Sequence, residues 1–227
     1  MFTKILEQPM ARETPTDESI SNVDATRQRL LEAAEEIFAE KGFEAATTRE
    51  ICERAGVRNI GAINYHFQGK ERLYAEAVRF AMSTCVCGAP FPEWPAGTSS
   101  RQKLRDFVRV MMARILEVPR PSAMHLMNRE MTRIAPSEVT ANAVRENIKP
   151  MADLLTQILA GLLPDLPFEK RVLIGFSVIG QCLYYRQNRV VGEVLFGRDV
   201  TRNYNAEFLA EHIADFTLAA VGKLADD

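Results

Sequence analysis

The segment Thr47–Val57 reads TTREICERAGV, and its pattern decides the fold of the N-terminal region. Thr47 and Glu50 have the spacing of a capping box, in which the threonine hydroxyl accepts from the Glu50 amide and the Glu50 carboxylate reaches back. This spacing predicts a short helix over residues 48–55. Gly56 ends that helix, because glycine adopts the backbone conformations of tight turns without strain.

A second short helix is expected directly after this glycine turn, over residues 58–66. It buries Ile60 or Ile63 and ends near Phe67. Two short helices joined by a tight turn make a helix-turn-helix. Helical hairpins of this shape also occur by chance as purely structural units. The side chains therefore have to distinguish a structural hairpin from a DNA-binding one.

A longer helix is expected on each side of this unit. Upstream, residues 26–41 repeat apolar side chains at helical spacing, and Gly42 stops the run. Downstream, a helix starts at Gly69–Glu71 and continues through Phe80. The apolar face of the upstream helix is Leu30, Ala34, Ile37 and Phe38, and the opposite face, expected in solvent, is Glu32, Glu35, Glu36 and Glu40.

The remaining chain also has helical periodicity and no strand-like alternation. A loop rich in proline and glycine is expected between Gly88 and Gly97. The later helices are expected near residues 100–117, 121–133, 137–162 with a bend at Pro150, 167–188 and 205–223. The fold class is therefore all-α, an N-terminal three-helix helix-turn-helix module followed by a larger helical domain.

Three segments are expected along the chain. Residues 1–24 are polar and carry mixed charge, so they form a flexible N-terminal arm. Residues 25–80 form the helix-turn-helix domain, and residues 81–227 form the larger body.

The composition is that of a globular protein, with 227 residues of which 47% are hydrophobic. The formal net charge of -2 provides no global attraction to nucleic acid, so any DNA binding depends on local placement of charge. The longest apolar run, Val172–Tyr185, is too short to span a bilayer. No secretory leader opens the sequence, so we expect a cytoplasmic protein without a membrane partner.

Cysteine and histidine residues are few and lack the spacing of a metal site. No His-Glu-x-x-His motif and no pairing of a nucleophile with a base is evident, so neither a cofactor nor an enzymatic activity is expected. The residues concerned are Cys52, Cys85, Cys87, Cys182, His66, His125 and His212.

Two segments carry a family resemblance, namely 46–57 and Ile63–Leu73, which reads INYHFQGKERL. Together they resemble the DNA-binding module of the tetracycline-repressor (TetR) family, and the resemblance covers Thr26–Arg72. Between Gly56 and Tyr65 this chain is one residue longer than the common pattern, and Asn64 stands where the family usually has a tyrosine.

The resemblance implies a set of contacts with double-stranded operator DNA. Phosphates position such a module, whereas base edges in the major groove specify the sequence. Arg49 matches a position that reaches a base, and Phe67 is expected in the core. The phosphate contacts implied are Thr48, Asn64, Tyr65, His66 and Lys70, and the residues expected against the major groove are Asn59, Ile60, Gly61 and Ala62.

The last two expected helices are interpreted as a dimerisation surface. Apolar residues cover nearly every side of 172–184, and Gly175 and Gly180 allow close approach of helices. The core of a monomer explains the same pattern. The resemblance favours a homodimer, because the family pairs these two helices from each subunit into a four-helix bundle.

A ligand site is expected in the body, because segments such as Asn128–Met131 and Ser177–Arg186 resemble the CecR-like C-terminal domain of one TetR subgroup, a ligand sensor. Five methionines lie between Met111 and Met131, and flexible thioethers suit a pocket for varied apolar ligands, although each is equally a core filler. The candidate ligand-binding residues are Met111, Met124, His125, Asn128, Gln181 and Tyr185.

The expected function is a ligand-responsive transcriptional regulator, most simply a repressor that a small-molecule inducer releases from its operator. The helix that starts at Lys70 is the expected link between the module and the body. Two alternatives remain open, a helical enzyme and a DNA-binding protein without a ligand.

Overall fold

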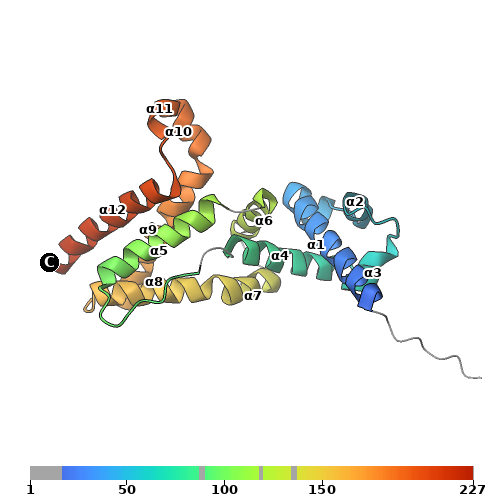
Figure 1. Ribbon diagram of the computed structural model, residues 1–227, viewed down its shortest axis with the longest axis horizontal. Helices are drawn as coiled ribbons and strands as arrows, with labels where there is room; N and C mark the ends of the chain where they lie inside the picture. The colour runs from blue at the N-terminus through green and yellow to red at the C-terminus, as the bar shows by residue number, and fades with distance from the viewer. Residues whose placement is uncertain (1–16, 87–89, 118–119, 134–136, 227) are drawn as a thin grey trace, which may run out of the picture.

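The computed structural model describes residues 17–86, 90–117, 120–133 and 137–226, and every regular element in these ranges is a helix (Figure 1). The all-α prediction is confirmed. The described helices are α1 (Asp17–Ala45), α2 (Thr48–Arg54), α3 (Gly61–Phe67), α4 (Lys70–Val86), α5 (Ser100–Leu116), α6 (Pro121–Met131), α7 (Glu138–Asn147), α8 (Lys149–Leu162), α9 (Phe168–Gln187), α10 (Arg189–Phe196), α11 (Arg198–Thr201) and α12 (Ala206–Asp226).

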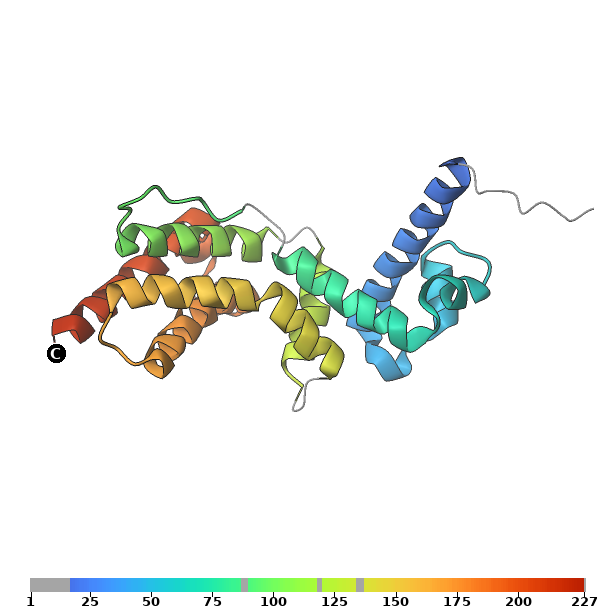
Figure 2. The same cartoon turned by 90° about the horizontal axis from the view of Figure 1, so that it is seen from below.

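The first core joins the N-terminal helices to two helices from later in the chain. Residues of α1 to α4 form one continuous buried cluster with Ala123, Met124 and Leu126 of α6 and Ala143 of α7. Figure 2 shows α6 and α7 beside α4, at the centre of an elongated molecule. The helix-turn-helix module is therefore seated on α6 and α7.

The second core lies at the other end of the molecule and contains α5, α8, α9 and α12. Its members include Phe107, Met112 and Leu159, which are fully buried. Gly175 packs α9 closely against α8, since a Cβ there would lie 3.5 Å from the Leu155 side chain.

A short helical hairpin, α10 and α11, connects α9 to α12 and stands away from the body (Figure 1). The expected helices left residues 189–204 unassigned, so this hairpin is a finding of the structure. Gly197 separates its two helices with a φ of 84°, a conformation that favours glycine.

The N-terminal helix differs from expectation at its start. It begins at Asp17, so residues 17–24 of the expected arm are helical, whereas residues 1–16 lie outside the described residues. Gly42 interrupts the helical conformation as expected, with φ 77° and ψ 177°, but α1 continues beyond this kink to Ala45. The boundaries proposed for the arm and the two domains stay predictions.

The helix expected over 137–162 is broken rather than bent. α7 ends at Asn147 and α8 begins at Lys149, with Pro150 in the first turn of α8. Proline has no amide hydrogen and its ring collides with the preceding turn, so it is tolerated only in a first turn.

None of the described helices combines the length and the apolarity that crossing a membrane requires.

Candidate nucleic-acid interface

The predicted capping box is present at the start of α2. The Thr47 hydroxyl accepts from the Glu50 amide at 3.2 Å, and the Thr47 amide donates to the Glu50 carboxylate at 3.0 Å. The turn after α2 closes through a 2.8 Å bond from the Val57 amide to the Cys52 carbonyl, and Gly56 has a φ of 66°. These local bonds determine where α3 begins.

The start of α3 corrects one part of the predicted DNA contacts. The helix begins at Gly61, where the Asn59 side-chain oxygen accepts from the Gly61 amide at 2.9 Å. Ile60 is 51% exposed, whereas Ala62 is 8% exposed and belongs to the N-terminal core. Because the helix starts three residues later than expected, Ala62 faces inward, and Asn59, Ile60 and Gly61 remain at the surface.

The buried face of α3 holds the module together. Ile63 is 1% exposed and Phe67 is 2% exposed, so Ile63 rather than Ile60 is the buried isoleucine and Phe67 is a core aromatic, as expected. The opposite face carries Asn64 and Tyr65, both exposed, and the Tyr65 ring is 74% exposed. Because α3 buries one face and exposes the other, its C-terminal end presents polar side chains to solvent.

The α2 side of this surface carries a guanidinium. Arg49 projects from α2 with 77% of its side chain exposed, and among the described residues it pairs with Glu53 alone, at 2.9 Å and one turn along the same helix. Such an exposed pair is weak because water screens it, so Arg49 can leave it for another anion. Thr48, at the first turn of α2, is partly exposed.

His66 and Lys70 lie at the other edge of this surface. His66 is partly exposed and makes an edge contact with Tyr65, with ring centroids 4.9 Å apart. Burial and the nearby Arg27 guanidinium lower the pKa of His66, so its ring is neutral near pH 7 and keeps one N–H donor. Lys70 is partly exposed, with its ammonium 4.5 Å from the centre of the Phe43 ring.

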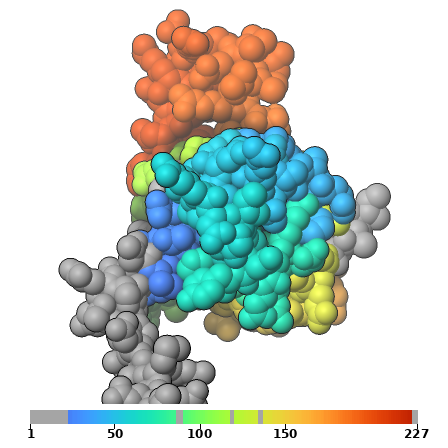
Figure 3. All heavy atoms as spheres, turned by 90° about the vertical axis from the view of Figure 1, so that its right-hand side faces the viewer, coloured from blue at the N-terminus to red at the C-terminus, as the bar shows by residue number. Residues whose placement is uncertain are grey.

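Arg58 is a further candidate that sequence reasoning missed. It lies in the turn between α2 and α3, is exposed, and takes part in no hydrogen bond or ion pair within the described ranges. It shares a shallow groove with Arg49 and Ile60. Its position one residue before Asn59 is the signal that could have identified it. Figure 3 looks onto this end of the molecule, where α2 and α3 form the outer surface.

The acidic residues of α1 are engaged away from this surface. Arg54 pairs with Glu36 at 3.0 Å and with Glu40 at 3.2 Å.

The prediction that Glu35 lies in solvent is wrong, because this side chain is fully buried. α6 covers that side of α1, where Ser122 donates to Glu35 at 2.6 Å and Arg120 donates at 3.3 Å.

The six residues predicted to bind a ligand do not form one pocket. Met124 is buried in the N-terminal core and Met111 in the C-terminal core, because α6 packs on α1 and α4 whereas α5 packs on α12. His125 is exposed, Asn128 is partly exposed on α6, and the Gln181 amide donates to the Ser177 carbonyl of its own helix at 3.3 Å. Only Tyr185 of this set lines a cavity, which lies beside α10.

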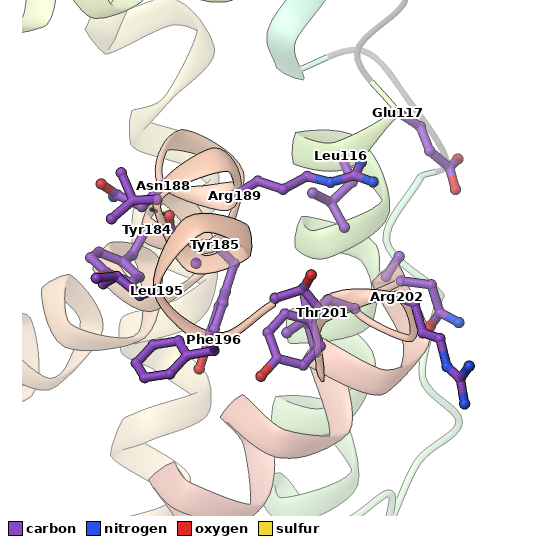
Figure 4. A pocket seen from close by; sticks show the side chains of 16 residues that line it. Leu116, Glu117, Tyr184, Tyr185, Asn188, Arg189, Leu195, Phe196, Thr201 and Arg202 are labelled. Atoms are coloured by element: carbon purple, nitrogen blue, oxygen red, sulfur yellow. Dashed lines mark hydrogen bonds between the residues drawn. The ribbon is translucent and has the colours of Figure 1, made fainter. Parts of the chain in front are cut away.

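A cavity of about 460 Å³ opens between the α10–α11 hairpin, the C-terminal ends of α5 and α9, and the start of α12 (Figure 4). Its walls are aromatic and aliphatic, with cationic side chains among them. The lining includes Tyr185, Leu195, Phe196, Arg202 and Tyr204.

Metal-ligating residues do not cluster within the described part of the chain, where no group of three His, Cys, Asp or Glu side chains could hold an ion. Cys52, Cys85 and Cys182 are free and buried. Burial raises the pKa of Cys182 to about 12, so this thiol stays protonated. Cys87 lies outside the described residues.

Two family models match the chain. The model for bacterial regulatory proteins of the tetR family matches residues 30–77. The model for the C-terminal domain of the HTH-type transcriptional dual regulator CecR matches residues 100–221, more than half of the chain.

Curated relatives are similar to this chain over short segments. The HTH-type transcriptional repressor AcnR of Corynebacterium diphtheriae is 42% identical over 62 residues, 26% of this chain and 32% of AcnR. The HTH-type transcriptional repressor KstR2 of Mycobacterium tuberculosis is 38% identical over 63 residues, 28% of this chain and 31% of that repressor. The matches thus span about a third of each relative's length.

Solved structures share the fold over most of the chain. A tetR family transcription regulator from Shewanella sp. PV-4 has a TM-score of 0.60 and 20% identity, covering 86% of this chain and 95% of that one. FadR from Bacillus subtilis, solved with stearoyl-CoA, has a TM-score of 0.56 and 16% identity, covering 84% and 97%. With its module and its body both matched, the chain belongs to the tetR family of bacterial regulatory proteins, in the group that carries a CecR-type C-terminal domain.

Proposed function

We propose that this protein is a homodimeric, sequence-specific regulator of transcription that binds double-stranded operator DNA and releases it when a small molecule binds. The observation that carries this proposal is the surface formed by α2 and α3. It presents Arg49, Arg58 and Tyr65 to solvent, while the apolar residues of both helices are buried. Such a surface suits the major groove, because guanidinium groups pair with guanine edges and with phosphates.

Phosphate contacts in this proposal come from Thr48, Asn64, Tyr65, His66 and Lys70, and Arg49 specifies a base. Asn59, Ile60 and Gly61 approach the groove, with Arg58 beside them. The acids of α1 do not repel DNA here, because Glu36 and Glu40 are paired with Arg54 on another side of the module.

An exposed apolar stripe on α9 and α12 supports the homodimer. Leu173, Phe176 and Tyr184 recur along α9 with exposed fractions of 63%, 69% and 59%, and Phe216 of α12 is 61% exposed. Apolar surface of this extent is characteristic of an interaction site. A two-fold dimer reads a pseudo-palindromic operator whose half-sites are about 34–36 Å apart or slightly more.

Release by a ligand is supported by the fold it shares with FadR, a structural neighbour solved with stearoyl-CoA. The cavity beside α10 also favours a ligand-responsive regulator over the alternative without a ligand. Such coupling is typically about 1–3 kcal/mol, or roughly 5–150-fold in operator affinity, and it is reciprocal.

The DNA-binding proposal is tested by measuring binding to a selected operator and to random DNA at several salt concentrations. Lys70→Ala should weaken binding to both DNAs about equally and lower the salt slope by about one unit. Arg49→Ala should cost roughly 1–3 kcal/mol, mainly at one base pair. Lys149→Ala, an exposed lysine of α8, is the matched control and should change neither measurement.

Wild-type binding of both module variants to both DNAs would overturn the assignment of this surface. The dimer has its own test, because Phe176→Glu should convert it to monomers in analytical ultracentrifugation, whereas Gln157→Glu on the exposed side of α8 should not. A stable wild-type monomer at micromolar concentration would refute the homodimer.

A further inference from the structure

We propose that the cavity beneath the α10–α11 hairpin is the effector site of this regulator, and that it takes an amphipathic anion, an apolar or aromatic body with one acidic group. This inference rests on the proposed function, because it assigns a site and a ligand class to the regulated release of DNA. No residue of this site except Tyr185 was a sequence-based candidate.

The shape and the walls of the cavity suit an apolar body. Its volume of about 460 Å³ lies within the range of pockets for small ligands, roughly 300–1,000 Å³. On one wall Tyr185 and Tyr204 meet edge to face, with ring centroids 6.1 Å apart. On the other wall Leu195 and Phe196 of α10 remain 66% and 68% exposed although they line the cavity. An apolar occupant removes this surface from water, which is favourable.

The charges around the cavity favour an anion. Arg202 lines it, is exposed, and has no hydrogen-bond or ion-pair partner for its side chain among the described residues. Arg189 also lines it and holds Glu193 at 3.2 Å, whereas Glu117 is the one acid of the lining. A free guanidinium binds a carboxylate or sulfonate through two parallel hydrogen bonds.

The other polar side chains of the lining are already engaged or are weak donors. Asn205 accepts from the Phe208 amide at 2.9 Å, and Asn188 donates to the Tyr184 carbonyl at 3.2 Å. Burial raises the pKa of Tyr185, so its hydroxyl stays protonated. Arg202, which Figure 4 shows at the outer edge of the cavity, is therefore the lining cation that we assign as the anchor of an acidic ligand.

The cavity wall lies close in sequence to the contact that holds the DNA-binding module. Leu116 and Glu117 line the cavity, and Arg186 of α9 donates to the Leu116 carbonyl at 3.3 Å. Arg120, which precedes α6, pairs with Glu35 at 3.3 Å and with further glutamates of α1. A ligand that displaces the end of α5 thus acts three residues away from a contact with α1.

The charge requirement is tested with two fluorescent probes that share one aromatic body, anilinonaphthalene sulfonate and the uncharged phenylnaphthylamine. We expect the wild-type protein to bind one sulfonate probe per chain. Arg202→Gln should weaken the sulfonate probe about tenfold and leave the uncharged probe unchanged, because it removes one charge-assisted interaction. Arg198→Gln is the matched control, since Arg198 lies on α11 with 90% of its side chain exposed and does not line the cavity.

The location is tested with a neighbouring pair of substitutions on α10. Leu195→Glu places a charge in the cavity and should abolish binding of both probes. Val194→Glu changes the adjacent residue, which is 78% exposed and outside the cavity, and should leave binding unchanged. If Leu195→Glu instead yields monomers and probe binding persists, the cavity wall is covered by a second copy of the chain and the proposal is wrong.

Operator binding separates this inference from the function on which it rests. If the sulfonate probe weakens operator binding in the wild-type protein but not in Arg202→Gln, the effector site is supported. If another compound releases the operator equally from the wild-type protein and Leu195→Glu, this assignment fails and the proposed function stands. If neither the wild-type protein nor any variant binds operator DNA, the proposed function itself fails, and this conclusion does not depend on whether the probes bind.

Discussion

The N-terminal core, which α1 to α4 share with α6 and α7, encloses the carboxylates of Glu35 and Glu130, whereas the C-terminal core contains no buried charged side chain among the described residues. Glu130 of α6 accepts from the Tyr74 hydroxyl of α4 and from the Thr140 hydroxyl of α7 at 2.5 Å. Burial and the bond to Glu130 raise the pKa of Tyr74.

The two cores are specified by different kinds of contact. Apolar contacts are non-directional, so the C-terminal core tolerates small shifts as long as its volume stays filled. Buried carboxylates are costly unless their hydrogen bonds are made, so they demand one arrangement of α1, α4, α6 and α7. One oxygen of Glu35 has no hydrogen-bond partner among the described residues, which makes that contact costly to maintain. The directional contacts therefore lie where the DNA-binding module meets the body.

The largest effect is expected in the apolar core. Phe107 is fully buried and stacks on Phe91 with ring centroids 4.9 Å apart. Phe107→Ala should lower the free energy of unfolding by about 4 kcal/mol, because it removes buried surface and leaves a cavity. Urea unfolding measures this, and Tyr65→Ala, at an exposed ring, should change stability by less than about 0.5 kcal/mol.

The next effect tests the polar junction. Glu130→Ala leaves the hydroxyls of Tyr74 and Thr140 buried without their acceptor, so the free energy of unfolding should fall by about 3 kcal/mol. Glu138→Ala changes an exposed glutamate of α7 and should have little effect. If Glu130→Ala and Glu138→Ala unfold at the same urea concentration, the contrast between the two cores does not hold.

A smaller effect is expected at the kink of α1. Gly42 has φ 77° and ψ 177°, a backbone conformation that residues with a Cβ rarely adopt, whereas the Arg129 guanidinium beside it is the flexible end of a side chain that can move. Gly42→Ala should therefore cost about 2 kcal/mol of stability. Gly222→Ala, at a helical position with open space around it, should stabilise by about 0.5–1 kcal/mol, so opposite signs in thermal unfolding are the expected result. If both substitutions changed the stability in the same direction, the backbone at Gly42 would not be strained by a Cβ.

The smallest effect concerns an exposed carboxylate, in contrast to the two buried ones. Hydrogen bonds from Lys41 and Thr47 lower the pKa of Glu50 from 4.5 to about 2. Because the folded pKa is lowered, the stabilisation is complete above pH 4.5 and is lost as the pH falls to about 2. Glu50→Gln should be less stable than the wild type near about pH 6 and should approach it near about pH 2.5. A stability difference that does not depend on pH would contradict this titration.

The sequence alone determined the local structure of the module. Thr47, Glu50 and Gly56 act within a few residues of one another, so the capping box and the turn were predictable and are confirmed. Apolar periodicity identified most of the helices, and the motifs in 46–57 and 63–73 identified the family. The contacts with DNA remain predictions, apart from Ala62, which the late start of α3 turns inward.

Only the tertiary structure decided which helices share a core and which surfaces remain open. Periodicity identifies one apolar face of a helix but does not show what covers the opposite face. It therefore predicts that Glu35 lies in solvent, whereas α6 packs over Glu35 and buries it. The sequence likewise predicts one pocket for Met111 and Met124, but these two residues lie in different cores. The cavity beside α10 was not predictable at all, because its walls meet through contacts between residues far apart in the sequence.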